Sequence, residues 1–93
     1  MSQNTIPPRD RAIEFPCDFP IKAMGTATDE LRDTVAAIIR RHAPQTPDEA
    51  IRSRASSGGK YLAVTITVRA TSQAQLDAIY LDLTACEQVM MAL

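Results

Sequence analysis

The side chains most capable of chemistry in this 93-residue sequence are one histidine and two cysteines. His42, Cys17 and Cys86 are far apart along the chain, and their spacing does not match that of a zinc site. A reactive thiol also needs a base or a positive charge beside it, which no neighbouring residue obviously supplies. We therefore expect two unreactive free thiols, and a histidine that stabilises a helix end instead of acting as a base or metal ligand.

A second candidate for chemistry is the segment Ser56-Ser57-Gly58-Gly59, whose composition resembles a phosphate-binding loop. It does not open a helix, so the free amides and the dipole that bind phosphate are missing, and a hairpin turn explains it better. An acylphosphatase would need an arginine in a phosphate-binding loop after the first strand. The segment Gly25-Thr26-Ala27-Thr28 contains no arginine, which argues against this chemistry. The sequence therefore predicts a protein that is not an enzyme and that holds no cofactor and no metal.

Periodicity and turn residues mark the elements that must position these side chains. Apolar residues at helical spacing predict a helix over 28–43, with Thr28 as its N-cap. Ser72 and Gln75 form a capping box that begins a second helix over 72–85. Strands are expected at 19–24, ended by Gly25, and at 50–56, 61–70 and 88–93.

This order of elements predicts an α+β fold of the ferredoxin-like βαββαβ type. Right-handed crossovers place both helices on one face of a four-stranded antiparallel sheet, with the first and third strands in its centre. Cys17 and Cys86 then lie at opposite ends of neighbouring strands, ~20 Å apart, which is too far for a disulfide that needs Cα atoms within ~7 Å. Residues 1–14 are polar and aperiodic, so we expect a flexible tail before a single domain over 15–93.

The sheet face turned away from the helices is the candidate binding surface. Alternation within 61–70 directs Leu62, Val64, Ile66 and Val68 towards the helices, and by the same parity Met90 is expected on the open side. In the last strand, Val89, Met91 and Leu93 are expected to share one face. Residues 50–76 contain four basic residues and no acid, so this side is mildly basic. The candidate binding residues are Lys22, Arg52, Arg54, Lys60, Tyr61, Thr65, Thr67 and Arg69.

Three interpretations of this surface stay open: an ordinary solvated face, a protein-binding or oligomerisation face, and a surface for single-stranded RNA. RNA-recognition domains share the topology but stack bases on aromatics of both central strands, and here only Tyr61 is present. The net charge of -1 also argues against nucleic acid. The sequence has no apolar run of about 18 residues and no signal peptide at its start, so we expect a cytoplasmic protein without membrane association.

Several motifs together resemble the YbeD-like family of small bacterial proteins of unknown function. They are Phe15-Pro16-Cys17-Asp18-Phe19-Pro20-Ile21-Lys22-Ala23-Met24-Gly25, Arg41-His42-Ala43-Pro44, Ser56-Ser57-Gly58-Gly59-Lys60-Tyr61, Val64-Thr65-Ile66-Thr67-Val68, Ala70-Thr71-Ser72 and Val89-Met90-Met91-Ala92-Leu93. The resemblance covers 15–93 and implies a sandwich similar to ACT domains, which sense small molecules in metabolic enzymes. Some members are encoded beside lipoate-attachment enzymes, which implies a link to lipoate metabolism. The resemblance implies no catalytic residue.

Two functional hypotheses follow. The first is a non-enzymatic regulatory or protein-interaction module, similar to a ligand-sensing ACT domain, that binds a protein or a second copy through its sheet face or edge strands. A small-molecule ligand is compatible with this role. The second is a single-stranded nucleic-acid-binding module that uses the basic open face.

Overall fold

The computed structural model of the protein describes residues 13–93 and contains every expected helix and strand. The elements in chain order are β1 (Cys17–Thr26), α2 (Leu31–His42), β2 (Ile51–Ala55), β3 (Tyr61–Ala70), α3 (Gln73–Ala85) and β4 (Met91–Ala92), with a single 3-10 turn at Asp48–Ala50 before β2. The tail predicted over 1–14 lies almost entirely outside the described residues.

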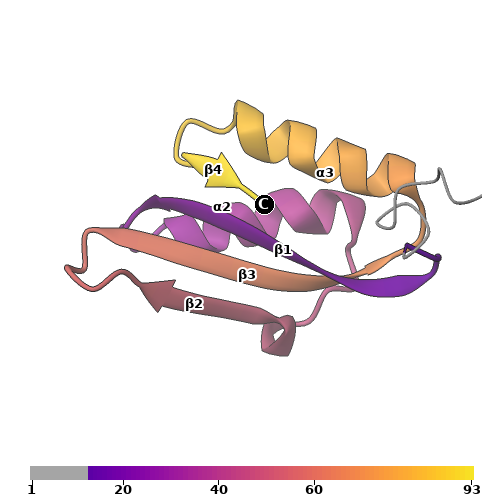
Figure 1. Cartoon of the computed structure of the whole chain (residues 1–93), viewed down its shortest axis with the longest axis horizontal. Helices are drawn as coiled ribbons and strands as arrows, with labels where there is room; N and C mark the ends of the chain where they lie inside the picture. The colour runs from indigo at the N-terminus through magenta and orange to yellow at the C-terminus, as the bar shows by residue number, and fades with distance from the viewer. Residues whose placement is uncertain (1–12) are drawn as a thin grey trace, which may run out of the picture.

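The four strands form one antiparallel sheet in the order β2-β3-β1-β4. Figure 1 shows β2 at one edge, β4 at the other beside α3, and both helices on the same side of the sheet. The predicted ferredoxin-like βαββαβ fold, with β1 and β3 in the centre, is therefore confirmed. Within residues 13–93, neither helix has the length and apolar character needed to cross a membrane.

The core lies between the sheet and the helices, where alternate strand residues meet the apolar stripes of α2 and α3. The predicted alternation of β3 is confirmed, because Val64, Ile66 and Val68 are buried. The largest fully buried side chains are Ile21, Leu31, Val35, Ile39, Val64, Ile66, Val68, Leu76, Ile79 and Leu83.

β1 extends beyond the predicted strand at both ends, and Gly25 does not end it. Gly25 lies inside β1, paired with Leu62. A Cβ atom there would collide with the backbone carbonyl of Gln88 and would lie 3.2 Å from a methyl carbon of Leu31. The glycine is therefore required because the chain before β4 packs directly on β1, which a sequence pattern of turn residues does not reveal.

Pro20 lies inside β1, opposite Thr67. The Ala27 N–H donates to the carbonyl of Lys60 at 2.9 Å. With the β1–β3 register, this bond shows that the odd-numbered residues of β1 direct their backbone groups to β3. The nitrogen of Pro20 therefore faces the side of β4, which pairs only with Ala23 and Met24. A proline is tolerated there because no strand partner is lost.

The predicted start of the first helix is wrong. α2 begins at Leu31, and Glu30 is its N-cap without a side-chain capping bond. Thr28 instead accepts the N–H of Leu31 with its carbonyl at 3.4 Å, in a turn that precedes the helix. A favourable capping residue was therefore present, but the turn used its backbone instead of its hydroxyl.

The capping box of α3 is confirmed in one half only. Ser72 Oγ accepts the N–H of Gln75 at 3.1 Å, as expected of an N-cap. The Gln75 side chain does not return to Ser72. Its Oε1 accepts the N–H of Thr71 at 2.7 Å, and its Nε2 donates to the carbonyl of His42 at 2.8 Å. Gln75 therefore ties the end of α2 to the start of α3.

β4 is shorter than predicted, and Met91 and Leu93 lie on the open side, where Met90 was expected. Ala92 pairs with the buried Ala23 and so faces the helices, whereas Met91 pairs with Met24 on the open side. Leu93 exchanges backbone hydrogen bonds with Lys22 and shares its face. Met91 and Leu93 are therefore exposed, and Met90 is not the residue of β4 that joins the open face. Val89 is buried as expected, but it precedes the strand in a turn, which shifts the alternation by one residue.

Candidate functional site

The strand register assembles the predicted basic residues on the sheet face opposite the helices, which we call the open face. Lys22 lies opposite Thr65, and Thr65 lies opposite Arg52, so these three residues form one row across β1, β3 and β2. In the next row, Ala63 lies between Arg54 and a methionine of β1. The side chains at Cα-paired positions of antiparallel strands share a face, so the two arginines and the lysine lie on one surface.

The hairpin end of the open face carries Lys60 and Tyr61. Tyr61 begins β3, and its N–H donates to Ser56 Oγ at 3.1 Å, which closes the turn. The Lys60 ammonium lies 5.5 Å from the centroid of the Tyr61 ring, a cation–π distance. A shallow hollow of about 340 Å³ adjoins the ring and is lined by Met24, Arg54, Ala55, Ser56, Ser57, Tyr61, Leu62 and Ala63.

At the other end of the open face, Arg69 is paired with an acid that the sequence reasoning missed. Asp18 lies opposite Arg69 in the β1–β3 ladder, and Arg69 Nη1 is 3.3 Å from Asp18 Oδ1. Side chains alternate between the two faces of β1, so the alternation that places Lys22 on the open face also places Asp18 there. Thr67 lies between the two ends, opposite Pro20. The charge of Arg69 is therefore offset locally, although an exposed pair of this kind stabilises little.

The positive charge that remains is concentrated in the middle of the sheet. None of the ion pairs within residues 13–93 involves Lys22, Arg52 or Arg54. Beside Lys22, an apolar margin of Met24, Met91 and Leu93 continues the open face onto β4. The sequence did not predict this margin, because Met90, and not Met91 or Leu93, was expected on the open face.

A cleft of about 620 Å³ lies where the β2–β3 ladder ends. The ladder stops at the pair Ile51–Ile66, so β3 continues beside the loop 43–50 without a strand partner on that side. Most polar groups around the cleft are already hydrogen-bonded to the protein. Thr46 Oγ1 donates to the Ala43 carbonyl at 2.8 Å, and Gln75 Nε2 donates to the His42 carbonyl at 2.8 Å. Most of the polar groups that line the cleft therefore hold the loop and its neighbours together, and few of them are free to bind a ligand.

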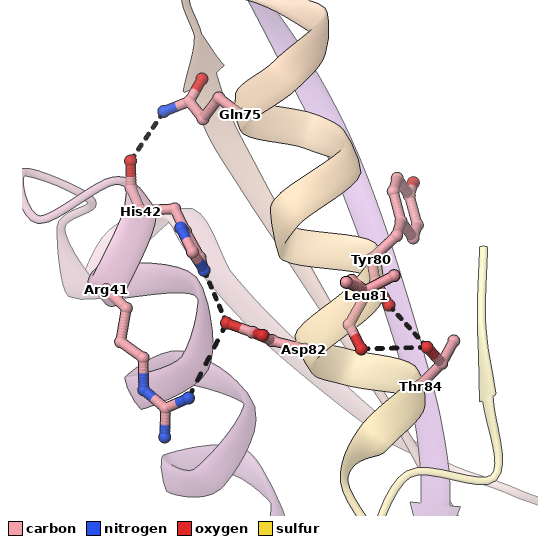
Figure 2. A network of polar contacts seen from close by, with 7 residues as sticks. All are labelled: Arg41, His42, Gln75, Tyr80, Leu81, Asp82 and Thr84. Atoms are coloured by element: carbon pink, nitrogen blue, oxygen red, sulfur yellow. Dashed lines mark hydrogen bonds and ion pairs between the residues drawn. The ribbon is translucent and has the colours of Figure 1, made fainter.

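His42 bridges the two helices instead of only ending its own. Figure 2 shows its ring and the Arg41 side chain meeting Asp82 of α3, at 2.7 Å from Nε2 and 3.8 Å from Nη1. Asp82 lies 40 residues away in the sequence, and only the packing of the helices brings it close. On the same helix, burial raises the pKa of Tyr80. None of the hydroxyl or thiol groups in residues 13–93 hydrogen-bonds to the His42 ring, and the contact that the structure shows for this ring is the one to Asp82.

The two thiols lie at different ends of β1. Cys17 begins β1 opposite Ala70, whereas Cys86 follows α3 and precedes β4, which pairs with the far end of β1. Both are half-exposed free thiols. No group of three His, Cys, Asp or Glu residues in the described part of the chain could hold a metal ion.

Arg40 fixes the loop that borders the cleft. Its Nε donates to the Thr46 carbonyl at 2.9 Å, and its Nη2 contacts Asp48 Oδ1 at 2.8 Å. The hydrogen bond and the charge of Arg40 hold the pKa of the Asp48 carboxyl below its usual range. The sequence reasoning missed this contact, which joins the end of α2 to the turn before β2.

We expect the Asp48 carboxyl to titrate below the ordinary aspartate pKa of about 3.9 in the native protein. Because its folded pKa is the lower one, its contribution to stability is present above the unfolded pKa and is lost as the pH falls through the folded pKa. NMR titration of the side-chain carboxyl measures this directly. In the Arg40→Gln variant the pKa should return towards the ordinary value, and an ordinary pKa in the unmodified protein would contradict the contact.

Comparison with known proteins places this arrangement among small bacterial proteins. A family described as "Protein of unknown function (DUF493)" matches residues 10–93. The chain is 45% identical over 87 residues to the UPF0250 protein RSc0326 of Ralstonia nicotianae, covering 94% of this chain and 90% of that protein. It is 46% identical over 85 residues to a UPF0250 protein of Chromobacterium violaceum, covering 91% and 96%.

Among solved structures, the chain is similar to the solution structure of protein HP0495 from H. pylori. The TM-score is 0.72 over 100% of this chain and 94% of that chain. At 16% sequence identity, this likeness supports the fold alone. The resemblance to the YbeD-like family that the sequence motifs indicated is confirmed by these matches.

Proposed function

We propose that this chain, which belongs to the DUF493 family of proteins of unknown function, is a non-enzymatic interaction module whose open face binds an acidic surface of a partner protein. One observation supports this proposal above the others. Both helices lie on the same side of the sheet, and the uncovered side carries Lys22, Arg52 and Arg54 without an acid partner among residues 13–93.

The composition of the open face suits a protein interface. Charged groups steer a partner and select its sign, whereas apolar side chains supply burial when water leaves. Here the cations of β1 and β2 lie beside the apolar margin of Met24, Met91 and Leu93. A partner with acidic groups around a small apolar centre would match both features.

The absence of an enzymatic role is part of the proposal and rests on the arrangement of the reactive groups. A nucleophile and its base must lie within hydrogen-bond distance. His42 is engaged by Asp82, and Cys17 and Cys86 lie at different ends of β1. Such an arrangement supports a binding role more than a catalytic one.

Binding of single-stranded nucleic acid is the alternative, and the open face supports it less well. Base recognition on a sheet uses exposed aromatic rings as stacking platforms. Tyr61 is the one aromatic residue with its side chain on the described open face, and Lys60 lies over its ring. The cations alone would attract phosphates, but they would not hold the bases.

The structure also supports less well a ligand-sensing role similar to that of ACT domains. The resemblance implies such a role, together with a link to lipoate metabolism. The cleft at the end of the β2–β3 ladder is where a small molecule would be expected to bind. Its polar groups Thr46 and Gln75 are already bonded within the protein, so a ligand would have to replace those bonds.

A charge-reversal experiment tests the proposal. The intact protein and its Lys22→Glu variant are used to capture proteins from the native extract after nuclease treatment, and mass spectrometry quantifies what each retains. We expect specific partners to fall by about tenfold or more with the variant, since reversing an interface charge replaces attraction by repulsion. High salt should also release them from the unmodified protein.

The matched control is Arg32→Glu, which makes the same change of charge on α2, away from the open face. Arg32→Glu should retain the partners that Lys22→Glu loses. An equal loss with both variants, or an unchanged set with Lys22→Glu, would refute binding through the open face. A parallel capture without nuclease distinguishes the alternative: proteins retained there and all lost after nuclease treatment would favour binding of nucleic acid.

A further inference from the structure

The outer edge of β2 presents backbone groups that no strand within residues 13–93 pairs with. The N–H of Ser56 donates to the carbonyl of Tyr61 at 2.8 Å, in register with the β2–β3 ladder. Since hydrogen-bonded pairs alternate along an antiparallel ladder, Arg52 and Arg54 direct their backbone groups to β3. Ser53 and Ala55 therefore direct theirs outwards, and both residues are exposed.

The side chains along this edge have one sign of charge. Arg52 and Arg54 are exposed on the open face, two residues apart, and face the small side chains of Thr65 and Ala63 across the ladder. Successive side chains on one face of a strand are ~7 Å apart, so the two guanidinium groups match acidic side chains at alternate positions of an added strand. No acid occurs anywhere in residues 50–76 to occupy them.

A second copy of β2 fits this edge poorly. An antiparallel pair of β2 strands in which both Ser53 and Ala55 lie opposite residues of the other β2 strand can centre on Ser53 or between Ser53 and Ala55. The first register places Arg52 opposite Arg54 of the other copy, and the second places the two copies of Arg54 opposite each other. Like charges directly opposite one another destabilise a strand pair, so these arginines oppose self-association through β2.

We propose that the β2 edge accepts an extended segment of a partner protein with acidic residues at alternate positions, and that Arg52 and Arg54 exclude a second copy from that place. This inference rests on the proposed binding of an acidic partner and adds where and in what form the partner binds. Strand addition gives affinity through the outward groups of Ser53 and Ala55, and the arginines give specificity.

The chain itself, with Arg52→Glu and Arg54→Glu, supplies a folded probe of the required chemistry. Its β2 edge carries acids at alternate positions. When the partner is the unmodified chain, both substituted positions lie opposite an arginine in the first register, and position 54 lies opposite Arg54 in the second. Isotope-labelled unmodified protein is titrated with the unlabelled double variant, and backbone amide exchange is followed by NMR. We expect exchange at Ser53 and Ala55 to slow by about tenfold at saturation, while Gly58 in the turn stays unchanged.

The controls separate charge from edge pairing. Titration with unlabelled unmodified protein should leave Ser53 and Ala55 unchanged, and a variant with Arg52→Gln and Arg54→Gln should produce a smaller effect than the glutamates. Unchanged exchange with both the glutamate and the glutamine variants would overturn the proposal, as would equal slowing by the unmodified protein. The Lys22→Glu capture experiment does not depend on the β2 edge. A failure of the strand-addition proposal can therefore be distinguished from a failure of the proposed binding through the open face.

Discussion

Replacement of Gly25 by alanine is expected to lower the free energy of unfolding by roughly 1–3 kcal/mol, the usual cost of forcing extra atoms into a packed site. The added methyl group would collide with the carbonyl of Gln88 and press on Leu31 at 3.2 Å. Because the obstructing atom is backbone, it cannot rotate away, and the chain before β4 would have to move off β1. Urea denaturation monitored by circular dichroism measures the change.

Gly58→Ala is the matched control for Gly25→Ala. Gly58 lies in the hairpin turn, and an added Cβ would meet no atom within 4 Å. This variant should stay within about 0.5 kcal/mol of the unmodified protein, as surface substitutions usually do. Equal stability of the two alanine variants would show that the chain before β4 does not pack on β1 as described.

The sheet was predictable where a strand is long and one of its faces is buried. The alternation of residues 61–70 fixed both faces of β3, and the topology then brought Lys22 and Arg52 into one row with Thr65. Parity predicts well in such strands, because a slip by one residue would move every apolar side chain to the solvent. The central part of the candidate surface therefore followed from local sequence alone.

The ends of elements were less predictable, because tertiary contacts decide them. Val89 is buried before β4 begins, and this single residue shifted the predicted faces of Met91 and Leu93. Thr28 had the side chain of an N-cap, but the turn before α2 used its carbonyl. At both places a favourable local pattern was present and packing selected a different use for it.

The ion pairs were missed for a related reason. Asp82 meets His42 across 40 residues of sequence, and Asp18 meets Arg69 across 51. Sequence spacing carries no information on such pairs until the strand register and the helix packing are known. For Asp18 the parity of β1 would have been sufficient, whereas for Asp82 the rotation of α3 about its axis was also needed.

Two leucines of α3 provide a second prediction of large effect. Leu83 is fully buried beneath α3, whereas Leu81, two residues before it, is 72% exposed. Leu83→Ala should lower the free energy of unfolding by about 2–5 kcal/mol through lost burial and the cavity that remains. For a domain of this size that is a large fraction of a total that is usually about 5–15 kcal/mol.

Leu81→Ala changes the same side chain on the same helix and should shift the free energy of unfolding by no more than about 0.5 kcal/mol. Alanine favours a helix at least as well as leucine, so helix propensity does not explain a difference between the two variants. Thermal and urea unfolding of both proteins would measure it. A similar loss of stability in both variants would mean that Leu81 is buried in solution, most simply by association of the α3 surface with another chain, and light scattering on the unmodified protein would then detect that assembly.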